Sequence, residues 1–167
     1  ASLKIKKQNP DAIMVVAPSD HWIEDEVQFC SNLQYAFDFC ERDENLMTLG
    51  ILPTFANTGY GYIEFDKLDS RPIKKVKQFR EKPDYATARK FIQSRNFLWN
   101  AGIFVWSAKS VLKAYEEFQP VMYDHFMNGY EALNTPKEEA FIKDNYPLAQ
   151  NISVDYAILE KAQNVYV

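Results

Sequence analysis

An acidic residue and a histidine follow the first apolar stretch of the chain, in the segment APSDH (17–21). The apolar residues 11–18 predict a short buried strand, so Asp20 and His21 lie just past its carboxyl end. In open α/β sheets ligands bind in the crevice at that end, and a carboxylate there is a candidate metal or hydroxyl ligand. The alternative is a turn in which Asp20 caps the following helix and His21 is a packed or hydrogen-bonded loop residue.

A glutamate and a lysine stand side by side in FREKP (79–83), at the end of a predicted strand. A carboxylate such as that of Glu81 can accept hydrogen bonds from two neighbouring sugar hydroxyls, and Lys82 supplies a point charge for a phosphate. Neighbouring strand residues point to opposite faces, so one pocket holds both side chains only where the strand ends. The alternative is an exposed ion pair before a proline turn.

Two more polar residues stand beside apolar stretches. Asn100, in WNAGIF (99–104), precedes two small residues and a predicted buried strand. Small neighbours let a ligand approach the backbone, and a buried amide offers both a donor and an acceptor, although an ordinary tight turn would also explain the pattern. Asp155, in SVDY (153–156), falls in the first turn of a predicted helix, where the dipole favours a carboxylate with or without a ligand.

The segment TGYGY (58–62) contains two of the five glycines of the chain, Gly59 and Gly61, just ahead of an alternating apolar run. Glycine weakens a strand interior, so its presence indicates a bulge, a bend or a place where a ligand lies against the backbone. The residues alone leave the choice between a bulge and a ligand open.

Three elements position the first of these residues. The apolar runs 11–18 and 46–53 predict buried strands, and residues 24–42 predict a helix. A strand, a helix and a strand form a βαβ unit with a right-handed crossover, which is typical of parallel sheets. The predicted apolar stripe on the helix consists of Val27, Cys30, Leu33, Phe37 and Cys40.

After residue 53 the pattern changes to alternating faces, which favours an antiparallel part of a mixed sheet. Residues 58–66 and 73–82 predict two strands. Asp84 caps a predicted helix that runs to residue 94, and residues 97–107 predict a loop that leads into a buried strand.

The last third of the chain is predicted to be mainly helical. We expect one helix over 108–118, capped by Ser107, and an aromatic amphipathic helix over 122–133. A short helix over 153–161 is expected to be capped by Ser153.

A further helix has a complete start signal, with Thr135 at the cap, Pro136 at the first helical position and Glu138 placed for a capping box. Residues 164–167 (NVYV) begin a strand. Together the elements predict one α/β domain over residues 1–167, with a mixed, mostly parallel sheet flanked by helices.

Composition limits the class of protein. A length of 167 residues suits one domain with a sizeable core, and 47% hydrophobic residues exclude disorder as a description of the whole. A formal net charge of −4, without a long basic run, argues against a nucleic-acid partner. The apolar runs are too short to span a membrane. The sequence has no basic segment followed by an apolar one at its start, so no signal peptide is expected.

The two cysteines, Cys30 and Cys40, fall on one predicted helix. At a rise of about 1.5 Å per residue they are separated by about 15 Å, which is too far for a disulfide. Without a CxxC pair a structural zinc site is not expected. Reduced cysteines in a cytoplasmic protein are the simplest interpretation.

The motifs, taken in order, resemble those of the mannose-1-phosphate guanylyltransferase family of sugar nucleotidyltransferases. FREKP stands where that family has F-x-E-K-P, and SVDYAILEK is similar to its S-[IV]-D-Y-x-[IVLM]-[LM]-E pattern. Each motif alone is weak, whereas the series in register over about residues 12–167 is specific. The motifs that carry the resemblance are PSDH, TGYGYI, FREKP, WNAGIF and SVDYAILEK.

The resemblance implies a glycosyltransferase-A-like sheet and the conversion of GTP and mannose 1-phosphate into GDP-mannose and pyrophosphate. By similarity, Asp20 matches the family acid that binds the catalytic Mg²⁺. Gly59, Tyr60 and Gly61 match the loop whose backbone lies against the sugar.

The resemblance also implies roles for the later motifs. Glu81 matches the residue that holds the mannose hydroxyls, and Lys82 matches the catalytic lysine on the phosphate side. Asn100 matches a residue that binds another sugar hydroxyl, and Asp155 matches a position near the sugar pocket.

The chain departs from the family pattern in two places. It contains neither the glycine-rich loop G-G-x-G-x-R-L-x-P, which cradles the triphosphate, nor the segment F-G-W-S-D, which carries the second Mg²⁺ ligand. The resemblance therefore implies a central part of a nucleotidyltransferase domain, truncated at both ends. We expect such a chain to be catalytically inactive alone.

Two other functions stay open. The first is a nucleotidyltransferase for another sugar 1-phosphate or another nucleotide, because the base-selecting segment is missing. The second is a non-catalytic module for sugar-phosphate binding or assembly. The aromatic helices around residues 115–130 can supply a homo-oligomer interface as readily as a core.

Overall fold

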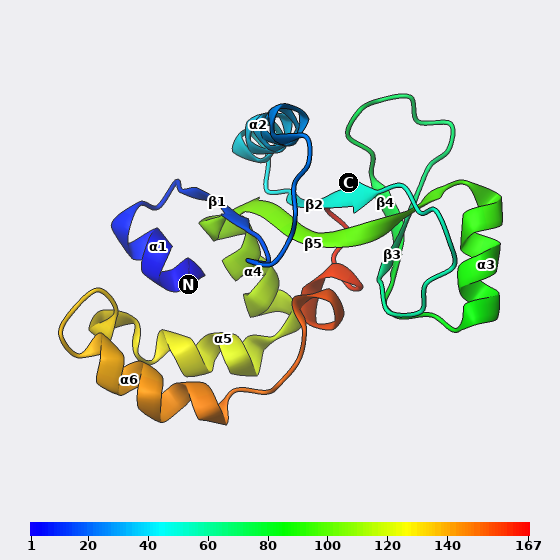
Figure 1. The fold of residues 1–167 in the computed structure, drawn as a ribbon. Helices are drawn as coiled ribbons and strands as arrows, with labels where there is room; N and C mark the ends of the chain where they lie inside the picture. Colours follow the sequence, from blue (N-terminus) through cyan, green and yellow to red (C-terminus); the bar gives the residue numbers. More distant parts are fainter.

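The computed structural model describes residues 1–167 and contains one six-stranded sheet flanked by helices (Figure 1). The strands are β1 (Ile13–Val16), β2 (Leu46–Ile51), β3 (Tyr62–Phe65), β4 (Val76–Arg80), β5 (Phe97–Ser107) and β6 (Val165–Tyr166). The α-helices are α1 (Ser2–Gln8), α2 (Glu26–Arg42), α3 (Tyr85–Ser94), α4 (Ala108–Phe118), α5 (Pro120–Met127) and α6 (Glu138–Asn145). Three short helical turns are η1 (Tyr130–Ala132), η2 (Tyr146–Leu148) and η3 (Asp155–Leu159).

The long strand β5 forms the middle of the sheet and pairs with three other strands. β2 pairs along one edge of β5, whereas β3 pairs with residues 97–99 of the other edge and β1 with residues 104–107. β4 extends the sheet beyond β3, and β6 extends it beyond β2. One strand therefore joins both ends of the sheet, as Figure 1 shows.

The mixed α/β sheet flanked by helices is confirmed, but the expectation that it is mostly parallel is wrong. The pairs β1–β5, β2–β5, β3–β4 and β3–β5 are antiparallel, and β2–β6 is parallel. β1 and β2 run in the same direction with α2 between them, as the βαβ pattern predicts. However, β5 is inserted between them and runs opposite to both.

Two strands differ from their predicted character. β1 pairs along one edge only, and Val15 and Val16 are 42% and 40% exposed, so the strand predicted to be buried over 11–18 is a short edge strand. Residues 97–107 are a strand throughout, without the predicted initial loop. The reason is that residues 97–99 already pair with β3.

The helix α2 covers one face of the sheet, and α4, α5 and α6 lie on the other (Figure 1). α2 begins after Asp25, whose carboxylate accepts from the backbone N–H of Gln28 at 2.9 Å. Its predicted stripe is only half right, because Val27 is 83% exposed and Cys30 is exposed. The stripe is right from Leu33 onward, because Leu33, Phe37 and Cys40 pack against the sheet together with Ala36.

Local start signals are confirmed for two helices. The carboxylate of Asp84 accepts from the backbone N–H of Thr87 at 2.8 Å at the start of α3. The hydroxyl of Ser107 accepts from the backbone N–H of Ser110 at 2.9 Å at the start of α4. The predicted final strand is also present, as β6, parallel to β2.

Two helices of the last third were predicted inaccurately. The helix expected over 122–133 is divided into α5 and η1 around Gly129, where an added Cβ would lie 2.0 Å from the ring of Phe141. α6 begins at Glu138, because Thr135 and Pro136 form a preceding turn. The carboxylate of Glu138 accepts from the backbone N–H of Asn134 at 2.6 Å instead of closing a capping box.

The segment predicted as a helix over 153–161 contains the π-helical turn η3. The hydroxyl of Ser153 accepts from the backbone N–H of Tyr156 at 3.5 Å, which is a long contact for a cap. Single π-helical turns are rare and occur frequently at functional sites.

The main core lies between the sheet and the helical elements α4 and η3, with a smaller core under α2. Both cysteines are free, and burial raises the pKa of Cys40 to about 12. No helix in the structure has the length and apolar character needed to cross a membrane.

Candidate functional site

Four of the predicted polar residues, Glu81, Lys82, Asn100 and Asp155, come together beside Gly61 (the polar cluster). Gly61 lies directly before β3, Glu81 and Lys82 directly after β4, Asn100 within β5 and Asp155 at the start of η3. The backbone N–H of Asn100 donates to the carbonyl of Gly61 at 2.8 Å. Strand pairing therefore brings together Gly61, Glu81 and Asn100, and the hydrogen bond from Asn100 to Asp155 adds η3.

The two predicted glycines have different surroundings. A Cβ on Gly61 would lie 2.5 Å from Oε2 of Glu81 and 3.3 Å from the ring of Phe79. A Cβ on Gly59 would meet only Oδ1 of Asn57, at 3.2 Å. Gly61 thus makes the space that a carboxylate occupies, whereas the backbone at Gly59 is open to solvent.

Glu81 and Lys82 form an ion pair, with 3.1 Å between Oε1 and Nζ. Neighbouring side chains meet in this way because β4 ends at Arg80 and Lys82 has a left-handed φ of 44°. The carboxylate is largely enclosed, with 10% of the Glu81 side chain exposed, whereas the Lys82 side chain is 61% exposed. The hydrogen bond that Lys82 donates to the Glu81 carboxylate, followed by the negative charge of that carboxylate, raises the pKa of Lys82.

The side chain of Asn100 is held from both ends. Its Oδ1 accepts from the hydroxyl of Thr48 at 2.8 Å and from the backbone N–H of Gly102 at 3.1 Å. Its Nδ2 donates to Oδ1 of Asp155 at 3.0 Å. The amide therefore connects the centre of the sheet to the π-helical turn.

Asp155 is a partly buried carboxylate near a second one. Burial is the main cause that raises its pKa, and the charge of Glu81 adds to it. Hydrogen bonds from Ser153 and Asn100 act in the opposite direction. The Glu81 and Asp155 carboxylates are two negatively charged acceptors in one partly buried site. This arrangement suits a ligand whose hydroxyl groups donate hydrogen bonds to both.

Aromatic side chains lie around Trp99, on the face of β5 opposite to Asn100. The ring of Trp99, the residue before Asn100, makes edge contacts with Tyr60 and Phe55, at centroid distances of 5.1 and 5.2 Å. Tyr60 was predicted as a site residue, and its backbone carbonyl accepts from the N–H of Lys82 at 3.2 Å. Phe55 and Trp99 were not predicted, because an aromatic residue in an apolar run looks the same as a core residue.

Two polar residues of the site were also missed. Thr48 is fully buried in β2, and Glu160 accepts from the backbone N–H of Glu81 at 3.4 Å. Thr48 has no signal in the sequence, since threonine is common in strands. Glu160 is the glutamate that ends the S-[IV]-D-Y-x-[IVLM]-[LM]-E pattern, but no role was predicted for it. Their roles appear only once β2, β5 and η3 are brought together.

Asp20 lies apart from the polar cluster. It is exposed and its side chain makes no hydrogen bond or ion pair. The turn that carries it nevertheless approaches β5 near Asn100, because Pro18 is the nearest side chain to Gly102, 3.6 Å from an added Cβ. His21 is exposed and is likewise without a side-chain partner.

The residues present fit a metal ion only in part. No group of three or more His, Cys, Asp or Glu side chains gathers anywhere in the chain. Mg²⁺ is commonly held by one or two carboxylates together with waters and substrate phosphates. An unpartnered exposed carboxylate such as that of Asp20 fits that mode of binding, and it does not fit a metal cage built by the protein alone.

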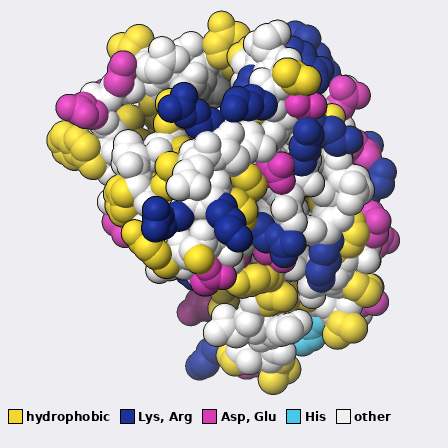
Figure 2. All heavy atoms as spheres, turned by 90° about the vertical axis from the view of Figure 1, so that its right-hand side faces the viewer, with side chains coloured by type: hydrophobic (Ala, Val, Ile, Leu, Met, Phe, Trp, Pro, Cys, Tyr) yellow, Lys and Arg dark blue, Asp and Glu magenta, His cyan; other side chains and the backbone are white.

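Basic residues gather on the face formed by β3, β4, α3 and the loop after β3, as Figure 2 shows (the basic face). Between residues 67 and 95 the acids are Asp69, Glu81 and Asp84. A positively charged surface next to a cleft attracts anionic ligands. The basic residues are Lys67, Arg71, Lys74, Lys75, Lys77, Arg80, Lys82, Arg89, Lys90 and Arg95.

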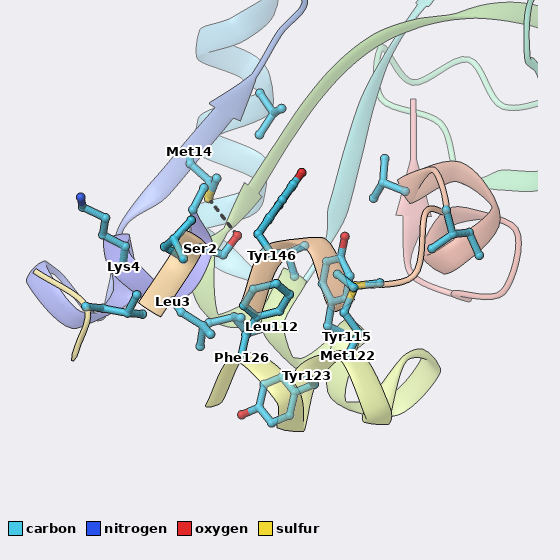
Figure 3. A pocket seen from close by; sticks show the side chains of 18 of the residues that line it. Ser2, Leu3, Lys4, Met14, Leu112, Tyr115, Met122, Tyr123, Phe126 and Tyr146 are labelled. Atoms are coloured by element: carbon cyan, nitrogen blue, oxygen red, sulfur yellow. Dashed lines mark hydrogen bonds between the residues drawn. The ribbon is translucent and has the colours of Figure 1, made fainter. Parts of the chain in front are cut away.

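An apolar cavity of about 700 Å³ lies elsewhere, between α1, β1 and the helices α4 to α6 (Figure 3). Its lining is mainly apolar and includes Met14, Tyr115 and Phe126, which come from β1, α4 and α5 (Figure 3). None of the predicted site residues lines it. The convergent polar groups, and not this apolar cavity, therefore mark the candidate site.

Comparison with known proteins identifies relatives of this chain. A mannose-1-phosphate guanylyltransferase of Salmonella muenchen is 33% identical over 158 residues, which are 94% of this chain and 33% of that protein. The xanthan biosynthesis protein XanB of Xanthomonas campestris pv. campestris (strain B100) is 33% identical over 168 residues, 100% of this chain and 35% of that protein. The chain thus spans about a third of the length of these curated relatives.

A solved structure from Thermus thermophilus, described as mannose-1-phosphate geranyltransferase, has the same fold. It matches with a TM-score of 0.83 at 24% identity, over 99% of this chain and 47% of that chain. The model of the nucleotidyl transferase family matches residues 1–146. With most of its length matched by that model, the chain belongs to the nucleotidyl transferase family.

Proposed function

We propose that this chain is the sugar-phosphate-binding part of a mannose-1-phosphate guanylyltransferase. In the proposed reaction a phosphate oxygen of mannose 1-phosphate attacks the α-phosphorus of GTP. A new P–O bond forms, the bond between the α-phosphorus and its bridging oxygen to the β-phosphorus breaks, and GDP-mannose and pyrophosphate result. The observation that carries the proposal is the convergence of Glu81, Lys82, Asn100 and Asp155 beside Gly61.

The polar cluster offers complementary groups for the two ends of mannose 1-phosphate. Glu81 and Asp155 supply carboxylate oxygens as acceptors for sugar hydroxyls, and Asn100 supplies a donor from Nδ2. Lys82, largely exposed beside Glu81, supplies a positive charge at the edge of the same site, where a phosphate would be neutralised. A sugar phosphate is a ligand that uses all four side chains.

The surroundings support a sugar ring in particular. Tyr60 is 45% exposed and its carbonyl bonds to the N–H of Lys82, so its ring provides an apolar surface beside the site, and Gly59 has no side chain that would block the approach of a ring. Sugar rings have apolar faces and hydroxyl-rich edges, so an aromatic surface beside paired acceptors matches their chemistry. The role proposed for the 59–61 segment is close backbone contact with the ring.

For the metal we propose that Asp20 is one carboxylate ligand of a Mg²⁺ ion. When bound, the ion would neutralise phosphate charge during transfer. The chain's own part is to keep the Asp20 carboxylate exposed and unpaired, on the turn that passes Gly102. The basic face would raise the local concentration of the anionic substrates. Two unpaired cysteines fit a reducing compartment, and we place the proposed enzyme in the cytoplasm.

The experiment that tests the function uses the product of the complete coding frame. Mannose 1-phosphate and Mg²⁺ are supplied with each of the four nucleoside triphosphates in turn, and pyrophosphate release is followed. The proposal expects release with GTP, and a loss of that release in Glu81→Gln. Release with another nucleotide only would replace the guanylyltransferase assignment by that of a different sugar nucleotidyltransferase. If a folded protein released no pyrophosphate with any nucleotide, the assignment of an enzymatic activity would be contradicted.

Binding is tested separately with the 167-residue chain. Calorimetric titration with mannose 1-phosphate should give heat that is lost in Glu81→Gln, with glucose 1-phosphate and inorganic phosphate as comparison ligands. The isolated chain should form no GDP-mannose, and product from it would contradict the assignment of this chain to the sugar-phosphate side only.

A further inference from the structure

The strand β5 contains an irregularity at the position of Asn100. Thr48 of β2 lies opposite Phe104, and Gly50 lies opposite Asn100, so one residue of β2 faces three residues of β5 between these pairs. Within that interval Gly102 has a left-handed φ of 68°. A bulge of this kind turns backbone groups out of the ladder and re-aims neighbouring side chains.

The bulge and Thr48 together determine which way the amide of Asn100 points. The Thr48 hydroxyl is 2.8 Å from Oδ1 of Asn100, and its other acceptor, the carbonyl of Ile103, is more distant at 3.4 Å. The Gly102 N–H is directed at the same Oδ1. A flipped amide would place its NH₂ group against the Gly102 N–H, and the Thr48 hydroxyl would have to give up its 2.8 Å bond to Asn100 for the longer one to Ile103, so the observed orientation is favoured.

The opposite end of the amide is thereby presented to the site. Nδ2 carries two hydrogens, one of which is used by Asp155 at 3.0 Å. The structure contains no second acceptor for Nδ2, so the other hydrogen is available to a ligand oxygen. A fixed Asn100 amide therefore orients both the Asp155 carboxylate and the second N–H of Nδ2.

We propose that Thr48 is a positioning residue, whose buried hydroxyl holds the amide of Asn100 with its donor end toward Asp155 and toward the bound sugar. The sugar part of this inference rests on the proposed function. Thr48 itself touches no ligand, because its side chain is fully buried in β2. A hydroxyl in such a place needs a partner to offset its desolvation, and the partner here is a group of the site.

The alternative is that the hydroxyl only satisfies the bulge and has no influence on the site. The substitution Thr48→Val separates the two, since it keeps the branched shape and removes the donor. Thr48→Ser keeps the donor and serves as the matched variant. Ser110→Ala is a control for the loss of a buried hydroxyl elsewhere, because Ser110 lies in α4 and bonds to Ser107 at the far end of β5.

The first readout needs no ligand. In ¹³C NMR titrations of the side-chain carboxyl groups, Thr48→Val should raise the pKa of Asp155 above that of the wild-type chain. The reason is that a released Asn100 amide no longer donates steadily to the ionised carboxylate. Thr48→Ser and Ser110→Ala should leave this pKa where it is in the wild type.

The second readout is binding and turnover. Thr48→Val should weaken calorimetric binding of mannose 1-phosphate about tenfold, and Thr48→Ser should restore it. In the complete coding-frame product the KM for mannose 1-phosphate should rise while the KM for the nucleotide stays unchanged. If Thr48→Val does not fold, Thr48→Cys and Thr48→Ser form the replacement pair, because a thiol is the weaker donor.

The outcomes separate the two proposals. A folded Thr48→Val with wild-type Asp155 titration and wild-type affinity would overturn the positioning role. A raised pKa of Asp155 in Thr48→Val, together with no binding of mannose 1-phosphate by the wild type, would support the positioning role and contradict the proposed substrate. Equal loss of binding in Ser110→Ala would also overturn the role, since it would show a general effect of lost stability.

Discussion

Gly61 and Glu81 are complementary in shape, because a Cβ on Gly61 would lie 2.5 Å from the Oε2 atom of Glu81. Gly61 has no left-handed φ that would itself require glycine, and it is buried. The carboxylate is packed over a backbone position without a side chain and paired through Oε1 with Lys82. The glycine-rich segment thus serves the placement of an acid as well as any contact with a ligand.

Gly61→Ala is expected to displace the carboxylate of Glu81 and to lower the free energy of unfolding by about 1–3 kcal/mol, because the Phe79 ring closes the other side. Binding of mannose 1-phosphate should weaken at least as much as it does in Glu81→Gln. Urea denaturation gives the stability, and calorimetric titration gives the affinity.

Gly59→Ala is the matched control for this substitution. An added Cβ there meets only the Asn57 side chain, at 3.2 Å, so the free energy of unfolding should change by less than about 0.5 kcal/mol. If Gly59→Ala and Gly61→Ala were equally destabilising, the packing of Glu81 over Gly61 would not be the cause.

Asp155 gives the protein a pH-dependent stability of predictable sign. Burial and the Glu81 charge raise its pKa in the folded state above the ordinary value of about 3.9. Between these two pKa values the folded chain binds more protons than the unfolded chain, so the free energy of unfolding falls as pH rises through that range. Asp155→Asn should therefore be more stable than the wild type at pH 7, with the difference vanishing near pH 3.

Urea denaturation at a series of pH values measures this effect. Asp11→Asn is the control, because Asp11 is exposed and its side chain has no hydrogen bond or ion pair, so its stability difference from the wild type should be close to zero throughout. Asp155→Asn should also weaken mannose 1-phosphate binding tenfold or more, about what loss of a hydrogen bond to a charged group costs. If Asp155→Asn were less stable than the wild type at pH 7, the inference that the surroundings of Asp155 disfavour its ionised form would be contradicted.

Features encoded over a few residues were predictable from the sequence, and features that depend on strand pairing were not. Asp84 and Ser107 cap their helices as predicted, because a cap is decided by the next three residues. The insertion of β5 between β1 and β2 is a long-range pairing without a local signal. For the same reason Val15 has the character of a core residue in the sequence and is partly exposed at the sheet edge.

The candidate site divides in the same way. Glu81, Lys82, Asn100 and Asp155 were predicted from motifs, and the structure brings all four together. Thr48 escaped prediction because its partner lies 52 positions away, across a bulge that no sequence pattern announces.

The basic face should make ligand binding sensitive to salt. Lys75 and Lys90 are exposed members of its basic residues and form no ion pair, so their replacement by glutamine changes charge and little else. The double variant should weaken mannose 1-phosphate binding about two- to threefold at low ionic strength and not at about 0.5 M salt, because screening removes long-range attraction.

The control for this effect is the double variant Lys109→Gln with Lys113→Gln in α4, where the lysines pair with Glu44 outside the basic face. It carries the same change in net charge. Equal weakening by both double variants would indicate an effect of net charge, and the basic face would have no special part in binding.

Asp20→Ala is expected to separate catalysis from folding and from sugar binding. Asp20 is exposed and makes no hydrogen bond or ion pair, so the free energy of unfolding should change by less than about 0.5 kcal/mol. Affinity of the chain for mannose 1-phosphate in the absence of Mg²⁺ should be unchanged, because the polar cluster does not include Asp20. In the complete coding-frame product, by contrast, pyrophosphate release should fall by at least about a hundredfold, as loss of a metal ligand implies.

The apparent Mg²⁺ requirement should shift to higher concentration, and Asp20→Glu, which keeps the carboxylate, should recover part of the activity. Full activity at the wild-type Mg²⁺ concentration in Asp20→Ala would exclude this carboxylate as a metal ligand, whereas a large loss of stability would show that its role is structural.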